Sequence, residues 1–291
     1  MVKSWALSYY FIAFVDVLGQ SNKLLNLTKL PITQNERDEA AAILHDTAYT
    51  ILSLRNGFRQ FFKSRNKSTG ILDSLPPDKR AIAEKMRRAE AIITGISDTT
   101  VIAIPLSNED DHCLSISSIY SALYSVCGMF LVALVEQKPI RCGIDIGLGV
   151  PLSKREIYGP SLVKAYNLES RIASYPRIVV GDSLFEYLNF VQNLGSEGIY
   201  AKFAKKTAGN CMELLTHDHD KIRIVDVIGK GVQSITGGID KSLVEKAYKF
   251  VVQSHDRYTN TGDAKLRARY GSLRSYFELK IPLWDIQPIN S

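Results

Sequence analysis

The feature that most limits how this chain can fold is the stretch from Cys113 to Val135, which carries no charged side chain. A helix of that length could span a bilayer. Serines at positions 115, 117, 118, 121 and 125 lower its hydropathy, and the flanking charges are acidic before it and mixed after it, without a positive-inside bias. We therefore expect a helix buried in the core of a folded domain and no membrane span.

Around this helix, strand-like and helix-like patterns of apolar residues alternate along the chain. The strand-like runs are Ser8 to Val17, Ala91 to Ile96, Thr99 to Pro105, Pro139 to Val150, Pro176 to Val180 and Lys221 to Ile228. Helical spacing occupies residues 35–64, 78–90, 160–173 and 182–193, and the C-terminal end also reads as helical. The resulting order, β-α-β-β-α-β-α-β, predicts an α/β (α+β) protein with a ferredoxin-like sandwich, added helices and a helical C-terminal extension.

Composition supports a soluble protein and leaves its partner open. A chain of 291 residues with 45% hydrophobic and 23% charged residues can bury a sizeable core. The net charge of +6 favours an anionic partner, which nucleic acid, a membrane surface or a polyphosphate would satisfy equally. The cysteines at 113, 127, 142 and 211 lack metal-site or redox-pair spacing, so we expect reduced core residues in a cytoplasmic protein.

Two carboxylates lie beside apolar strands, where an unpaired negative charge is unfavourable. Asp16 ends an apolar strand just before the turn Val17, Leu18 and Gly19, and Asp98 sits at the tip of a predicted hairpin. Carboxylates brought together by adjacent strands repel each other unless a divalent cation lies between them, and the turn could aim backbone N–H groups at phosphate oxygens. From residue types alone, a turn residue at 98 and a helix cap at 16 explain the same pattern equally well.

A resemblance to a known family favours the metal interpretation. The segments 11–19 and 96–99 resemble the first and second metal motifs of class III nucleotidyl cyclases, and 141–147 resembles their next strand. The motifs at 157–159, 168–170 and 176–180 follow in the family order, so the resemblance covers roughly residues 8–190. It implies a catalytic domain over 1–195, including the long first helix and an insertion at 65–90, with 196–291 packed on the same unit.

The resemblance also implies roles for individual residues. Two divalent metal ions, Mn²⁺ or Mg²⁺, would be held by Asp16, the backbone of Val17 and Asp98, and would bind the triphosphate while activating the attacking hydroxyl. Arg141 would contact the triphosphate. As catalytic residues we therefore expect Asp16, Asp98 and Arg141.

This sequence departs from the family at two places. Where family members carry an asparagine and a transition-state arginine, this chain carries Val163 and Asn167, so Lys164, Arg171 or an arginine from elsewhere would have to stabilise the developing charge. Where adenylate-forming members read the purine with a lysine and an aspartate, it carries Thr94 and Glu156.

A narrower resemblance accounts for these departures. The helix from Gly159 to Ser170 and the run from Tyr175 to Val180 resemble the pyrimidine (uridylate and cytidylate) cyclases of bacterial Pycsar antiphage systems. This implies conversion of UTP or CTP to a 3′,5′-cyclic mononucleotide and pyrophosphate. We expect UTP as the substrate and cyclic UMP as the product, with cytidylate as the alternative. Tyr49 on the first long helix is either a core residue or a ring that stacks on the base beside Thr94, Glu156 and Asn167.

The implied partners are a pyrimidine nucleoside triphosphate, a second copy of the chain in a homodimer, and an effector activated by the cyclic product. We expect neither a membrane nor a nucleic-acid partner. Two rivals stay open. One is a purine cyclase with a rearranged pocket; the other is a catalytically dead homologue that binds a nucleotide or nucleic acid, which the missing dyad and the basic segment from Arg55 to Arg88 favour.

Overall fold

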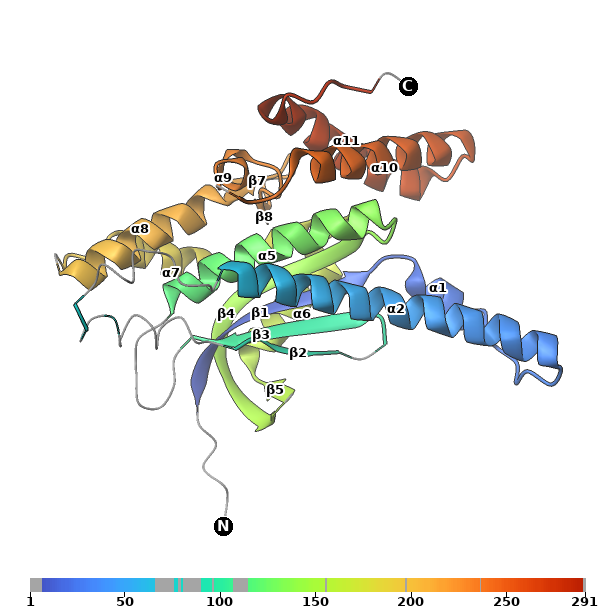
Figure 1. Ribbon diagram of the computed structural model, residues 1–291, viewed down its shortest axis with the longest axis horizontal. Helices are drawn as coiled ribbons and strands as arrows, with labels where there is room; N and C mark the ends of the chain where they lie inside the picture. The colour runs from blue at the N-terminus through green and yellow to red at the C-terminus, as the bar shows by residue number, and fades with distance from the viewer. Residues whose placement is uncertain are drawn as a thin grey trace, which may run out of the picture.

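The computed structural model describes residues 7–65, 76–77, 80, 90–95, 97–106, 115–154, 156–196, 198–235 and 237–289. The predicted insertion at 65–90 and the helix expected over 78–90 lie almost wholly outside these residues. The chain forms a mixed α/β structure in which one eight-stranded sheet is covered by helices (Figure 1). The predicted mixture of α and β elements is confirmed.

The sheet has the strand order β2-β3-β1-β4-β6-β8-β7, and β5 pairs with β4 alone. The strands are β1 (Ser8–Val17), β2 (Ile92–Thr94), β3 (Thr99–Pro105), β4 (Ile140–Ser153), β5 (Glu156–Tyr158), β6 (Ile178–Val180), β7 (Leu215–His217) and β8 (Arg223–Val225). Strands β1 to β4 are mutually antiparallel where they pair, and β6 joins β4 in parallel. The order β2-β3-β1-β4 in a β-α-β-β-α-β chain is the ferredoxin-like arrangement that the sequence pattern predicts.

One face of the sheet is covered by α2 (Gln34–Arg65) and α5 (Ile116–Val135), which pack against each other (Figure 1). Alternate residues of β1, namely Phe11, Ala13 and Val15, enter this main core because side chains alternate across a strand. The two helices approach closely at Gly128, where an added Cβ would lie 2.6 Å from the Phe61 ring.

Helix α5 contains the uncharged stretch discussed above. Among the described residues it is the one helix long and apolar enough to cross a membrane, and 83% of its most apolar window is buried inside the protein. Helices α2, α8 (Ile199–Glu213) and α10 (Lys241–Asn260) all pack on it. The prediction of a buried core helix is confirmed.

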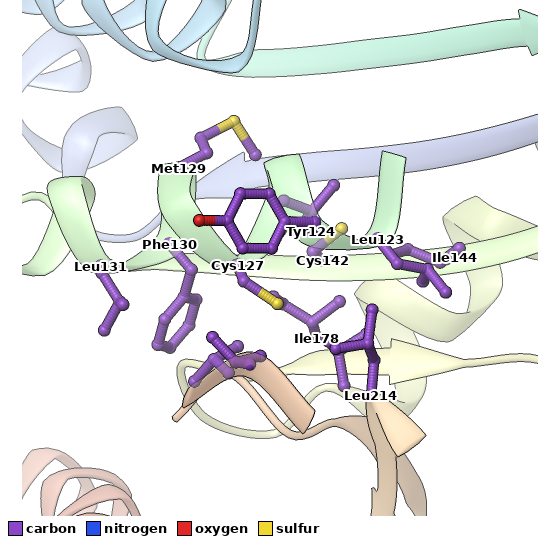
Figure 2. Close-up of a cluster of buried hydrophobic side chains, with 14 of the residues drawn as sticks. Leu123, Tyr124, Cys127, Met129, Phe130, Leu131, Cys142, Ile144, Ile178 and Leu214 are labelled. Atoms are coloured by element: carbon purple, nitrogen blue, oxygen red, sulfur yellow. The ribbon is translucent and has the colours of Figure 1, made fainter. Parts of the chain in front are cut away.

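Behind α5 the core continues toward the strands added after β4. Figure 2 shows Cys127 and Phe130 of α5 meeting Cys142 of β4, Ile178 of β6 and Leu214 at the end of α8. Cys127, Cys142 and Cys211 are buried and free, which confirms the predicted core position of these three cysteines. Burial raises the pKa of each thiol, so the thiols stay protonated. Cys113 lies outside the described residues.

On the other face of the sheet, the described residues provide cover mainly through one helix. Here α6 (Pro160–Asn167) runs into a π-helical turn at Leu168–Ile172 and packs over β1 and β4. A second, smaller core forms under it from Tyr10, Ile12, Ala103, Ile157 and Ala165. We call this side of the sheet the open face.

The C-terminal part adds helices around the far half of the sheet. They are α7 (Asp182–Gln192), α8, the short α9 (Lys230–Gln233), α10, α11 (Ala264–Lys280) and a 3₁₀ turn at Ile281–Trp284; a further short helix, α1 (Gln20–Leu25), follows β1. Residue Asp226 after β8 accepts hydrogen bonds from Tyr276 and Lys280 of α11, at 2.7 Å each. The late strand that the sequence predicts is present as β8, in the same sheet as β1 to β4, and the predicted helical C-terminal end is present as α10 and α11.

Candidate active site

The candidate site lies where β1, β3 and β4 run side by side. Asp16 of β1 pairs across the sheet with Thr99 of β3 on one side and with Arg141 of β4 on the other. Because Val15 and Val17 enter the main core, Asp16 between them faces the opposite way, onto the open face. Arg141, between the core residues Ile140 and Cys142, does the same.

Arg141 stands between two carboxylates. Its Nη2 lies 2.9 Å from Oδ2 of Asp16 and 2.8 Å from Oε1 of Glu169, and its Nη1 donates to the Ala173 carbonyl at 3.4 Å. The bond to Asp16 is an aligned hydrogen bond, whereas the contact to Glu169 is close but not aligned for one, so it is an ion pair. The side chains of Asp16 and Arg141 are 19% exposed and that of Glu169 only 4%.

Local backbone structure explains how Glu169 reaches this position. The N–H of Ala173 donates to the Leu168 carbonyl, five residues back, which is the hydrogen bond of a π-helix. The turn is pressed onto β4 at Gly143, where a Cβ would lie 2.2 Å from the Ala165 carbonyl and 2.6 Å from the Glu169 amide. Only a glycine lets the helix come this close, and the approach brings Glu169 beside Arg141.

The charge state of Glu169 reflects competing effects. Burial raises its pKa to about 7; Arg141 acts to lower it, while the negative charges of Asp16 and Asp98 raise it. The charges of both predicted metal ligands therefore affect the pKa of Glu169. Asp16, Asp98 and Glu169 are close enough to interact electrostatically, and Arg141 forms ion pairs with Asp16 and Glu169.

Asp98 is presented by the predicted hairpin. Ser97 takes a left-handed backbone conformation (φ 55°), and Asp98 follows it, one residue before the Thr99 that pairs with Asp16. Arg55 of α2 holds the hairpin from the helix side, through Nε to Thr100 Oγ1 at 3.2 Å and Nη2 to the Thr99 carbonyl at 3.3 Å. The expected presentation of a carboxylate by a turn is observed.

The turn after Asp16 agrees only in part with the sequence-based expectation. Val17 is buried, and Gly19 is left-handed (φ 80°) as it enters the short α1. The amide of Leu18, however, donates to the Pro139 carbonyl at 2.9 Å. The expectation that this amide is aimed at phosphate is wrong for this conformation, because a neighbouring loop already uses it.

Two predicted substrate residues lie on the open face. Thr94 at the end of β2 pairs with Val101 of β3, and Val101 pairs with Phe14 of β1. Thr94 is therefore level with Phe14, which precedes Asp16 by two residues on β1. Asn167 ends α6, next to Tyr166, whose ring packs edge-on against Phe14 at a centroid distance of 5.3 Å. Both residues therefore border the site without contacting Asp16.

The remaining predicted substrate residues lie elsewhere on the chain. Tyr49 is 63% exposed on α2 and stacks on His45, so the core interpretation of this tyrosine is wrong. Glu156 is exposed on β5 and pairs with Ser153, twelve positions (153 − 141) along β4 from Arg141. At about 3.3 Å per residue that is roughly 40 Å of strand, so Glu156 does not reach the site of its own chain.

Lys164, one of the residues named as a replacement for the missing arginine, already has a hydrogen-bond partner. Lys164 donates to Ser183 of α7 at 2.7 Å, beside a hollow of about 500 Å³ bordered by Tyr9 at the opposite end of β1. Arg171 is exposed on the π-helical turn. We therefore assign Lys164 no part in the site.

The residues present fit hard divalent cations. Within the described ranges, no three histidine, cysteine or acidic side chains are grouped so as to hold a metal by themselves. A magnesium-type site does not need three, since it commonly uses one or two carboxylates together with water and substrate phosphates. Asp16, Asp98 and the Val17 backbone would hold the ions, and Asp16 must then exchange Arg141 for a cation.

Comparisons with known proteins give the following. No family model and no curated protein sequence matches the chain. The catalytic core of a rhodopsin-guanylyl cyclase with converted specificity, in complex with ATPαS, is similar in structure at 12% identity and a TM-score of 0.37, over 62% of this chain and 81% of that one.

Two other solved structures are also similar. A bacterial light-regulated adenylyl cyclase matches at 10% identity and a TM-score of 0.40, over 78% of this chain and 54% of that one. The guanylyl cyclase domain of RhoGC from the aquatic fungus Blastocladiella emersonii matches at 10% identity and a TM-score of 0.32, over 64% of this chain and 89% of that one. Identities and TM-scores this low do not establish a shared function.

Glu169 and Arg55 are the site residues that sequence reasoning missed. Glu169 lies in the motif at 168–170, but nothing in the sequence announces a π-helical turn that would bury it. Arg55 is a charged residue at the edge of the apolar face of α2. The Thr99 carbonyl that it contacts lies 44 positions away in the sequence. Only the fold brings these two residues to the site.

Proposed function

We propose that this chain is a nucleotidyl cyclase that converts UTP into 3′,5′-cyclic UMP and pyrophosphate. The observation that carries the proposal is the cluster at the end of β1, where Asp16 and Arg141 face the open side of the sheet and the charge of Asp98 acts on the neighbouring Glu169. Carboxylates for cations beside a fixed guanidinium are what a triphosphate requires.

The reaction follows from these parts. The ribose 3′-oxygen attacks the α-phosphorus in line, the bond from that phosphorus to the bridging oxygen breaks, pyrophosphate leaves, and the hydroxyl proton passes to solvent. Divalent cations, when bound, lower the pKa of the hydroxyl and neutralise the phosphates. Arg141 binds phosphate oxygens of the leaving group, and the hairpin held by Arg55 keeps Asp98 in place.

A homodimer is part of the proposal. Phe14, Val101 and Leu162 on the open face are only partly buried, and Val163 and Tyr166 of α6 are 57% and 48% exposed. A second copy would cover these side chains and bring its own α6 and β5 to Asp16. Glu156 and Asn167, which do not contact Asp16 in their own chain, would then reach the base from the partner.

The pyrimidine preference has support from residue chemistry. Thr94 cannot make the charge-assisted contact with adenine that a lysine makes, and it offers a hydroxyl that can donate to or accept from uracil. The motif order over 159–180 supports a cyclase that acts in the cytoplasm as a source of an antiphage signal, with an effector that responds to the product. A cytidylate cyclase is the alternative within the same chemistry.

One observation favours a second candidate, a homologue that binds a nucleotide without turning it over. Arg141 occupies the Asp16 carboxylate, and the described part of α6 carries Val163 and Asn167 where catalysis would need an asparagine and an arginine. Incubating the protein with each of the four nucleoside triphosphates and Mn²⁺, then separating the products by chromatography, tests both candidates. A cyclic mononucleotide with equimolar pyrophosphate is expected; binding without product supports the second candidate.

A further inference from the structure

Arg141 depends on Asp16 for one of its two ion pairs. A single nitrogen, Nη2, lies within 3 Å of both Asp16 and Glu169. If the proposed function holds, a divalent cation takes the Asp16 carboxylate during each reaction cycle. The guanidinium then loses that partner and gains a like-charged neighbour, and both effects push it out toward solvent.

We infer that Glu169 is the positioning residue for Arg141, the second carboxylate that keeps this guanidinium on the open face when a cation occupies Asp16. The inference rests on the proposed function and deepens it. Glu169 touches neither substrate nor cation in this account; it acts through Arg141 alone.

Burial and backbone contacts fix the position of Glu169. It is 3% exposed, and its backbone is held by the π-helical turn, which packs against β4 at Gly143. A second arginine, Arg177, holds the end of that turn by donating a hydrogen bond to the Ile172 carbonyl at 2.8 Å. Arg177 is itself 4% exposed and also donates to Asp218 at 2.6 Å. Glu169 therefore has no freedom to follow a guanidinium that swings outward, and it retains Arg141 where it stands.

Simple electrostatics predicts the opposite effect, which makes the inference testable. Removing a negative charge beside an anion site strengthens anion binding, if charge is all that matters. Removing a residue that positions the anion-binding arginine weakens it. The Glu169→Gln variant, which has nearly the same shape and no charge, separates the two.

The experiment measures binding of inorganic pyrophosphate in the presence of Mn²⁺ by isothermal titration calorimetry, which needs no turnover. We expect Glu169→Gln to weaken binding about tenfold, the scale of one charge-assisted contact. Arg141→Ala should weaken it at least as much, and adding Glu169→Gln to Arg141→Ala should cause no further loss. Glu245→Gln on the exposed side of α10 is the matched charge control and should bind as wild type does.

Unchanged or tighter pyrophosphate binding by Glu169→Gln would overturn the inference. An equal loss of affinity when Glu169→Gln is added to Arg141→Ala would also overturn it, and so would the absence of Mn²⁺–pyrophosphate binding by the wild type. If the glutamine variant does not fold, Glu169→Asp keeps the charge but withdraws it by one methylene. Its binding should be weaker than wild type, and wild-type affinity in a folded aspartate variant contradicts the inference.

The outcomes for the inference and for the proposed function are separable. A wild type that turns over no triphosphate, while Glu169→Gln still weakens pyrophosphate binding, rejects the cyclase and keeps the positioning role. A wild type that forms cyclic nucleotide, while Glu169→Gln binds pyrophosphate normally, rejects only the positioning role.

Discussion

At the scale of single residues, the account depends on four side chains at the end of β1. Asp16 and Arg141 are cross-strand neighbours, Asp98 lies one position beyond the β3 partner of Asp16, and Glu169 is electrostatically coupled to all of them. Three of these four follow from the sequence motifs. Glu169 does not, because its burial depends on a local departure from α-helical geometry.

We expect Asp16→Ala and Asp98→Ala each to lower the rate of cyclisation by at least ~100-fold, or about 2.7 kcal/mol of barrier, because each removes a cation ligand. Rates at equal concentrations of folded protein measure the effect. Asp182→Asn, at a side chain that is 86% exposed, is the matched control and should retain wild-type activity. Wild-type rates in either alanine variant would remove the two-metal assignment.

The pKa of Glu169 predicts a pH-dependent stability. Its folded pKa of about 7 lies above the ordinary glutamate pKa of 4.5, so the folded state binds the proton more tightly than the unfolded state. Stability contributed by the protonated form is present below pH 4.5 and is lost as pH rises to about 7. The loss is bounded at about 3 kcal/mol.

Urea unfolding of the metal-free protein at pH 5 and pH 8 measures this loss. Glu169→Gln, which cannot ionise, should be less sensitive to pH over that interval than the wild type. A pH dependence that is the same in both proteins would show that other groups account for it.

At the scale of elements, apolar periodicity predicted the strands and helices that build the ferredoxin-like half. The strands at 8–17, 99–105 and 140–150 and the buried helix at 116–135 are present because each buries a face with a clear period. The strands β5 and β7 were not predicted because they are mostly exposed or half-buried, whereas the equally short β6 and β8 are largely buried and apolar. The π-helical turn was not predicted either, because its residues also satisfy an α-helical pattern.

A substitution at Gly143 tests how closely α6 and the π-helical turn pack on β4. A Cβ at this position would overlap the Ala165 carbonyl, so Gly143→Ala should displace α6 and cost about 1–3 kcal/mol of unfolding free energy. Gly195→Ala, where an added Cβ has nothing within 4 Å, is the matched control and should change stability little. Equal stabilities of the two variants in urea unfolding would contradict the close contact.

At the scale of the whole molecule, one chain does not bring all the predicted site residues together. Residues for cations and phosphate gather at Asp16, whereas Glu156 and Tyr49 lie elsewhere on the same chain. Family resemblance assigned Glu156 to the site, and aromatic stacking suggested Tyr49, but linear spacing cannot distinguish a site within one chain from a site shared by two. The partly covered open face is the structural reason to propose sharing.

Mixing two inactive chains tests a shared site. One carries Asp16→Ala and the other Val163→Glu, which puts a carboxylate at an exposed point of α6. Random pairing makes half of the dimers mixed, each with one intact site of two, so the mixture should recover about a quarter of wild-type activity. No recovery, with mixed dimers demonstrated by mass spectrometry, would place the whole site within one chain.

Cyclisation of a pyrimidine triphosphate is measured in a competition assay with UTP, CTP, ATP and GTP at equal concentrations and Mn²⁺, with products separated by chromatography. A two-ring base should lose contacts at Thr94, where no lysine reads the purine. The account predicts cyclic UMP as the main product, absent from the Asp16→Ala protein. Cyclic CMP would change only the preferred base, cyclic AMP or cyclic GMP would overturn the pyrimidine assignment, and no cyclic product from any triphosphate would contradict the cyclase itself.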